Sequence, residues 1–151
     1  GHRQLECIVL CNLGVHLDGQ GRTTEALARL EQAIAVAREL RDRRSEGQFL
    51  GYLGLVHARE QRFEQARQWA VDGERLLQDL GDPISLSLLW CARAEIEQLA
   101  QEIGLARQYH GQAEALAEQS GAGADSEIGL ALARVRQRLA AESVANAPAT
   151  G

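Results

Sequence analysis

The chain has 151 residues, of which 45% are hydrophobic and 25% are charged, and its formal net charge is -5. This length suits one domain with a sizeable core, and the acidic balance argues against a nucleic-acid surface, which needs clustered positive charge. No apolar run approaches the roughly 20 residues of a membrane span, and the three cysteines are too few for a disulfide framework. We therefore expect a soluble, cytoplasmic domain that contacts neither nucleic acid nor a membrane.

The two ends of the chain differ from its middle. The opening GHRQLE has no initiator methionine and enters a helical pattern almost at once, so we interpret residues 1–3 as a tag remnant and the start of a domain cut from a longer protein. The closing SVANAPATG has the composition of a frayed end. We expect the folded domain to cover residues 4–141 and a flexible tail to cover residues 142–151.

Apolar residues recur at three- and four-residue spacing, which is typical of amphipathic helices. Leu10, Leu13 and Leu17, for example, share one face of the first segment. Helix-like stretches alternate with short polar turns along the chain. The pattern predicts seven helices, over about residues 4–18, 23–41, 44–59, 63–80, 83–100, 103–119 and 125–141.

Start signals agree with this division. Asp82 followed by Pro83 predicts an N-cap with proline in the first helical turn. Ser45 with Gln48 fits a capping box at the start of the third helix. Asp42 occupies the position equivalent to Asp82, forty residues earlier.

A period of forty residues runs through the chain without a gap, and such a period marks a helical array. Small residues, which let two helix backbones approach closely, recur at fixed positions. These are Gly14, Gly54 and Ala94; Ala26, Ala66 and Ala106; and Ala33, Gly73 and Ala113. Large apolar residues form another column at Leu10, Leu50, Trp90 and Leu130.

The stretch LDGQGRTTEA, residues 17–26, superficially resembles a phosphate-binding loop. No lysine follows Gly21, no strand-like run precedes Gly19, and the equivalent stretches forty and eighty residues later lack the glycine pair. We therefore predict a repeat turn in which the glycines end one helix and Thr23 or Thr24 caps the next.

On these columns the sequence resembles the tetratricopeptide repeat family in a forty-residue form. The resemblance implies an all-α, right-handed solenoid of three helical hairpins, over about residues 4–42, 43–82 and 83–122, followed by a capping helix over 125–141. The first two repeats match well. The third places Arg93 and Glu97 where apolar residues are expected, and an i, i+4 pair on a partly exposed face would explain both.

In this family the first helices of the hairpins line a concave groove for a partner segment. The resemblance therefore implies partner-binding positions along three helices. They are Cys11, Asn12, Val15, Asp18, Gln48, Tyr52, Leu55, Arg59, Leu88, Cys91, Glu95 and Gln98. This surface is mildly apolar and lacks the basic clusters with which some family members hold a terminal carboxylate, so an apolar peptide or helix fits it better.

No residues combine into a catalytic or metal site. Cys7 and Cys11 lie one turn apart without a nearby histidine or acid to complete a metal ligand set, and we expect all three cysteines to be free thiols. His16, His57 and His110 occupy three different repeat positions, and none has a nucleophile beside it. We expect no enzyme activity, no metal and no cofactor.

The resulting hypothesis is a protein-interaction module from a larger bacterial regulatory or signalling protein, whose groove binds a protein or peptide. One alternative is a dimerisation element, or an element that docks onto another domain of the same polypeptide, in a signal-transduction ATPase, transcription regulator or kinase. A further alternative is a sensor whose groove binds a small ligand.

Overall fold

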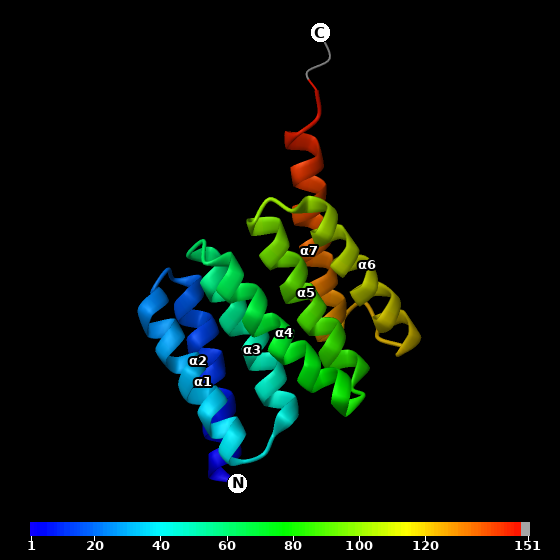
Figure 1. Ribbon diagram of the computed structural model, residues 1–151. Coiled ribbons are helices and arrows are strands. Elements are labelled where there is room, and N and C mark those ends of the chain that lie inside the picture. Colours follow the sequence, from blue (N-terminus) through cyan, green and yellow to red (C-terminus); the bar gives the residue numbers. More distant parts are fainter. Residues whose placement is uncertain (149–151) are drawn as a thin grey trace.

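The computed structural model describes residues 1–148, which form seven α-helices and no strand (Figure 1). The helices are stacked side by side, with the pair α1 and α2 at one end and α6 and α7 at the other. The all-α solenoid predicted from the sequence is thereby confirmed. The helices are α1 His2–Gly19, α2 Thr23–Glu39, α3 Arg43–Arg59, α4 Phe63–Leu80, α5 Pro83–Leu99, α6 Ile103–Gln119 and α7 Glu127–Ala145.

Both ends of the domain extend beyond the predicted limits. Helix α1 begins at His2, before the predicted start at residue 4, and Arg3 pairs with Glu6 at 2.7 Å. Helix α7 continues to Ala145, so the first residues of the predicted tail are helical. Residues 149–151 of that tail lie outside the described residues.

The turns repeat every twenty residues, each with one residue in the left-handed region. Their φ angles lie between 55° and 74°, at Gly21, Arg41, Gln61, Gly81, Gln101 and Gly121. Gly21 in the stretch LDGQGRTTEA therefore has the same backbone role as Gln61 and Gln101. The predicted threonine cap is wrong, because Arg22 is the N-cap of α2 and the Thr23 hydroxyl donates instead to Glu60, at 3.0 Å.

Aspartates cap the helices that open the second and third hairpins. Asp42 accepts a hydrogen bond from the Ser45 amide, and Asp82 accepts one from the Ser85 amide, both at 3.1 Å. The predicted Ser45–Gln48 capping box is wrong, because α3 begins two residues before Ser45. The Gln48 amide donates to the Ser85 hydroxyl on α5 instead, at 3.0 Å.

Each hairpin is held together by close backbone contact at small residues. Ala26, Ala66 and Ala106 have no exposed surface. A Cβ atom on Gly73 of α4 would lie 2.5 Å from the carbonyl oxygen of Gly47 on α3, closer than any real contact. Larger residues would therefore force the two helices of a hairpin apart.

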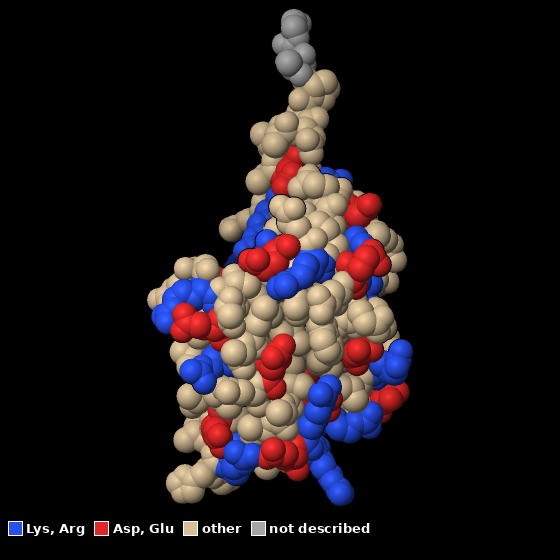
Figure 2. Space-filling view, turned by 60° about the vertical axis from the view of Figure 1, so that its left-hand side comes forward, with Lys and Arg blue, Asp and Glu red and all other residues tan. Residues whose placement is uncertain are grey.

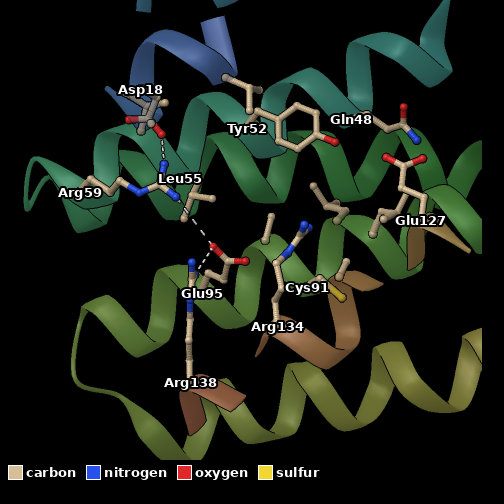
Figure 3. A pocket seen from close by; sticks show the side chains of 17 residues that line it. Asp18, Gln48, Tyr52, Leu55, Arg59, Cys91, Glu95, Glu127, Arg134 and Arg138 are labelled. Atoms are coloured by element: carbon tan, nitrogen blue, oxygen red, sulfur yellow. Dashed lines mark ion pairs between the residues drawn. The ribbon is translucent and has the colours of Figure 1, made fainter. Parts of the chain in front are cut away.

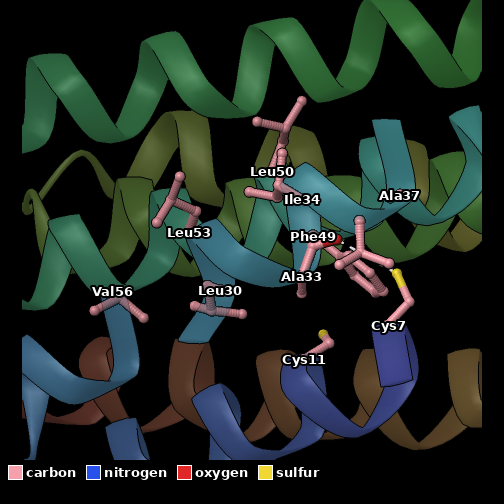
Figure 4. Packing of buried hydrophobic residues seen from close by; sticks show 11 residues of the cluster. Cys7, Cys11, Leu30, Ala33, Ile34, Ala37, Phe49, Leu50, Leu53 and Val56 are labelled. Carbon is pink, nitrogen blue, oxygen red and sulfur yellow. Dashed lines mark hydrogen bonds between the residues drawn. The ribbon is translucent and has the colours of Figure 1, made fainter. Parts of the chain in front are cut away.

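The core of the contact between the first and second hairpins is apolar (Figure 4), while ion pairs such as Arg38 with Glu46, at 2.7 Å, lie at its margin. Phe49, Leu53 and Val56 of α3 are at most 6% exposed, and they belong to one cluster with Leu30 and Ile34 of α2. Burial of branched and aromatic side chains of this size contributes roughly 1.5–3 kcal/mol each. This cluster joins the two hairpins into one continuous core.

The contact between the second and third hairpins contains charges. Arg67 of α4 donates to both carboxylate oxygens of Glu97 on α5, at 2.8 Å and 3.1 Å, and Glu97 is only 1% exposed. Arg93 lies 3.4 Å from Glu74, 3.9 Å from Glu97, and 4.7 Å from the centre of the Tyr109 ring. The predicted Arg93–Glu97 pair on a partly exposed face is therefore corrected: both residues are buried, and the main partner of Glu97 is Arg67.

Helix α7 does not continue the forty-residue register. Residues 120–126 separate it from α6, whereas only Gly81 and Asp82 separate α4 from α5. As a result Val135 is fully buried and Leu130 is 54% exposed, although Leu130 was predicted to share a buried column with Leu50. The longer loop shifts the buried face of α7 by about one residue.

Candidate functional site

The first helices of the three hairpins, together with α7, line one concave pocket of about 360 Å³ (Figure 3). Helix α1 contributes residues near its C-terminal end, and α3 and α5 form the floor of the pocket. Helix α7 forms the wall at the far end. Four helices separated widely in sequence thus present side chains to a single hollow.

The structure brings most of the predicted groove residues together in this pocket. Those that line it are Val15, Asp18, Gln48, Tyr52, Leu55, Arg59, Leu88, Cys91 and Glu95. Three others do not. Cys11 is only 3% exposed and belongs to the core between the first two hairpins, Asn12 is exposed outside the pocket, and Gln98 lines a smaller depression beside Arg59.

Sequence reasoning missed the contribution of α7. Glu127, Ala131, Arg134 and Arg138 complete the pocket lining. The forty-residue register places Arg134 in the column of Gly14, Gly54 and Ala94, which would bury it. The sequence does contain one sign that the register changes before α7. This sign is the glycine-rich segment SGAGADS, which precedes the helix.

The floor of the pocket is apolar. It is formed by Tyr52 and Leu55 from α3 and by Leu88, Cys91 and Ala92 from α5. Burial raises the pKa of Tyr52 to about 12, and the nearby charge of Glu127 adds to this effect. Burial likewise raises the pKa of the Cys91 thiol to about 12. Both groups are therefore neutral at ordinary pH, and the floor provides an uncharged contact surface.

A row of alternating charges crosses one end of the pocket, with one residue from each lining helix (Figure 3). Asp18 of α1 pairs with Arg59 of α3, which lies 4.0 Å from Glu95 of α5. Glu95 in turn lies 2.7 Å from Arg138 of α7. Burial lowers the pKa of Arg59, and the adjacent carboxylate of Glu95 opposes this shift. These charges are satisfied by one another and link the four helices.

Arg134 differs from the other arginines that line the pocket. Arg59 and Arg138 each have a carboxylate partner, but Arg134 has no carboxylate within 4.0 Å among residues 1–148. Figure 3 shows its side chain extending from α7 into the pocket near Cys91. Glu127, two turns earlier on α7, also lines the pocket without an ion-pair partner in the same part of the chain. Among the described residues, the pocket therefore offers an apolar floor with one free cation and one free carboxylate beside it.

Figure 2 shows basic and acidic side chains intermixed over one face of the molecule. Many of them pair locally, as Arg22 does with Glu25 at 2.6 Å. Such exposed pairs contribute little to stability.

The remaining candidates from the sequence have structural positions. Cys7, Cys11 and Cys91 are free thiols and all are buried, as predicted. His57 and His110 are buried and His16 is exposed. Across residues 1–148, no three His, Cys, Asp or Glu side chains gather in a way that could hold a metal ion. In the same range, no helix has the length and apolarity needed to cross a membrane.

The stacked hairpins and the concave pocket on their first helices define an α-helical repeat protein. Residues 5–79 match the family model of the tetratricopeptide repeat, which covers the first two hairpins. The chain belongs to the tetratricopeptide repeat family. A comparison with curated protein sequences finds no match.

Proposed function

We propose that this chain is a non-catalytic interaction module whose concave pocket binds a segment of a protein partner. Tetratricopeptide repeats generally act as scaffolds that bind proteins or peptides. The observation that carries the proposal for this chain is the pocket itself, in which four helices present an apolar floor together with an unpaired arginine. A hollow of this kind suits one or two apolar side chains that leave water on binding.

The charges of the pocket narrow the class of partner. Arg134 is free to pair, whereas Arg59 and Arg138 are neutralised by Asp18 and Glu95. A partner with a carboxylate beside its apolar side chains would give Arg134 a charge-assisted hydrogen bond. We therefore propose a helical or extended segment in which leucine-like residues adjoin an aspartate or glutamate.

The setting that we propose is a larger bacterial regulatory or signalling protein in the cytoplasm. Three buried, unpaired cysteines suit a reducing compartment. In that setting the partner segment could also belong to another domain of the same polypeptide, such as that of a signal-transduction ATPase, transcription regulator or kinase. The chemistry of the pocket is the same in either case.

The test is selection of peptides from a displayed random library on the immobilised chain. We expect selected sequences to share apolar residues next to an acidic residue. Val15→Arg, in the pocket lining, should abolish their binding without changing the helical content measured by circular dichroism, because Val15 is 44% exposed. Leu105→Arg is the matched control, because Leu105 is 41% exposed and does not line the pocket. Binding that survives Val15→Arg, or that Leu105→Arg also abolishes, would contradict the proposal.

The volume of the pocket favours one second candidate. About 360 Å³ lies within the usual range for small-molecule sites, so a sensor for a small apolar anion is compatible with the same residues. A thermal-shift screen with medium-chain and aromatic carboxylates distinguishes the two, since a ligand that binds only the folded state raises the melting temperature. A screen in which no carboxylate raises it, alongside recovered peptides, would exclude the sensor.

A further inference from the structure

The outer face of α1 is an apolar surface that no other part of residues 1–148 covers. Leu5, Ile8, Val9 and Leu13 are 61%, 43%, 54% and 39% exposed. They recur at three- and four-residue spacing and so lie on one side of the helix. No Asp, Glu, Lys or Arg occurs in α1 between Glu6 and Asp18. Contiguous apolar faces of this kind mark interaction sites.

The opposite face of α1 is also apolar. Cys7, Cys11 and Leu17 point into the core, with exposures of at most 5%. A helix that is apolar on both sides is typical of a buried helix rather than of one at the surface. Helix α1 therefore has the composition of a helix with neighbours on two sides, and only one side has them.

Comparison with α3 shows which part of the face is specific to α1. Val9 and Leu13 correspond, forty residues on, to Phe49 and Leu53, which are buried against the preceding hairpin. Leu5 and Ile8, in contrast, correspond to the polar Ser45 and Gln48. These four pairs show that the apolar surface of α1 is wider than the one with which α3 meets its neighbour.

The far end of the stack does not offer a matching surface. The exposed large hydrophobic residues of α7 are Leu130 and Val144, which are 54% and 78% exposed and lie far apart on the helix. Arg136 lies between them and pairs with Glu114 of α6. A head-to-tail contact would therefore leave most of the outer face of α1 without an apolar partner. Among residues 1–148, no other helix carries a run of exposed large hydrophobic residues like that of α1, so the same face on another molecule matches it best.

We propose that the outer face of α1 is a symmetric dimer interface, in which α1 packs antiparallel against α1 of a second copy. A two-fold axis at Val9 places Leu5 opposite Leu13 of the second copy and keeps Glu6 opposite the neutral Asn12. A helix of this length offers a face only about 27 Å long. The interface is thus at the small end for protein contacts, and we expect dissociation in the micromolar range.

The first experiment measures the association state by sedimentation equilibrium, from low micromolar to near-millimolar concentration. The chain should form dimers. Leu13→Glu should weaken association at least about tenfold, because it would bury a charge in the interface, opposite Leu5 of the second copy. Leu13 is already 39% exposed, so the variant should keep its melting temperature. Leu105→Glu is the matched control and should still dimerise.

The second experiment locates the axis with an introduced thiol. Val9→Cys should form a disulfide-linked dimer under mild oxidation, whereas Val144→Cys, at a residue 78% exposed near the end of α7, should not. The native thiols are buried and give little background. A chain that stays monomeric throughout, or that cross-links equally at both positions, would overturn the proposal.

A third experiment tests the main alternative, in which another hairpin of the same repeat, and not a second copy, covers the outer face of α1. Residues 43–82 joined directly in front of Arg3 would place one forty-residue hairpin against α1 in the repeat register. If the original chain is monomeric and this fusion melts at a higher temperature, the face belongs to a stacked hairpin and not to a second copy. If the original chain dimerises and the fusion does not, α1 is confirmed as the interface. Neither result depends on the concave pocket.

Discussion

The two contacts between successive hairpins use the same backbone arrangement but differ in chemistry at equivalent buried positions. Phe49, Leu53 and Val56 of α3 form an apolar contact with α2, whereas Arg93 and Glu97 of α5 take part in a charged contact with α4 and α6. Leu53 and Arg93 occupy the same repeat position. The comparison shows that the small residues at the hairpin contacts, rather than the chemistry between hairpins, set the geometry of this stack.

The free energy of unfolding should fall most when one partner is removed from the charged contact. Glu97→Ala removes a carboxylate that is 1% exposed and leaves Arg67 and Arg93 without their common partner. We expect the free energy of unfolding to fall by about 3–5 kcal/mol, as for other buried ion pairs that lose one member. Urea denaturation followed by circular dichroism measures this loss.

A replacement that removes the charges together provides the matched control. Arg93→Leu with Glu97→Leu copies the apolar character of the α3 contact, and Arg67, which is partly exposed, can turn to solvent. We expect the double variant to recover most of the stability lost in Glu97→Ala. A double variant less stable than Glu97→Ala would show that the two contacts are not interchangeable.

Removing an apolar side chain from the contact between α2 and α3 should lower the free energy of unfolding less. This loss should not depend on salt concentration. Leu53 is 2% exposed within the cluster shared by α2 and α3, so Leu53→Ala should lower the free energy of unfolding by about 2–4 kcal/mol. The loss should be the same at low and high ionic strength. A loss that changes with salt would indicate that the two contacts are coupled.

The aspartate caps should contribute similarly at both contacts, although their further partners differ. Gln4 donates to Asp42 at 2.8 Å, whereas Arg44 of α3 forms an ion pair with Asp82. Burial opposes ionisation of Asp82, but the hydrogen bonds from Ser85 outweigh it, so the pKa of Asp82 is lowered; Ser45 has the same effect on Asp42. Each carboxylate therefore stabilises the fold above its unfolded pKa, near 4, and the stabilisation is lost as the pH falls through the lower folded value.

Removing either cap measures this contribution. Asp42→Ala and Asp82→Ala should each cost about 1 kcal/mol at neutral pH, because the Arg44–Asp82 pair, whose arginine is 66% exposed, adds little. The cost should shrink as the pH falls well below 4 in urea titrations. A much larger cost for Asp82→Ala at neutral pH would contradict this and show that Arg44 stabilises the second cap.

Substitutions in the turns should change the free energy of unfolding least. Gln61 and Gln101 have positive φ angles at the position that Gly21 occupies in the first hairpin. Gln61→Gly and Gln101→Gly should relieve this strain and raise the free energy of unfolding by about 0.5 kcal/mol, after the entropy that glycine adds to the unfolded chain. Thermal melts of both variants check the sign, and a lower melting temperature for both would contradict it.

The sequence predicted the fold well because the forty-residue period is visible in small residues such as Gly54 and Ala66, whose spacing is strict. The internal helix boundaries followed from the same period. Arg93 and Glu97 were misplaced because their burial depends on Arg67 and Tyr109, which belong to neighbouring helices. No local pattern reports such a contact between distant positions.

The candidate site was predicted only in part for a related reason. The family register located Tyr52, Leu55 and Cys91, which lie within regular repeats. It failed for Arg134, because the longer loop before α7 shifts the buried face of that helix. The length of one loop thus decides whether this arginine is buried or lines the pocket.

The central claim is that the concave pocket binds a segment with an acidic residue beside apolar ones, through Arg134. The most direct measurement is a calorimetric titration of one selected peptide against the chain, Arg134→Glu and the control Arg136→Glu, an exposed residue on the same helix. We predict that Arg134→Glu weakens binding at least about tenfold, that Arg136→Glu does not, and that exchanging the acidic residue of the peptide for lysine restores binding to Arg134→Glu. Equal affinity of all three proteins for the original peptide would contradict the claim.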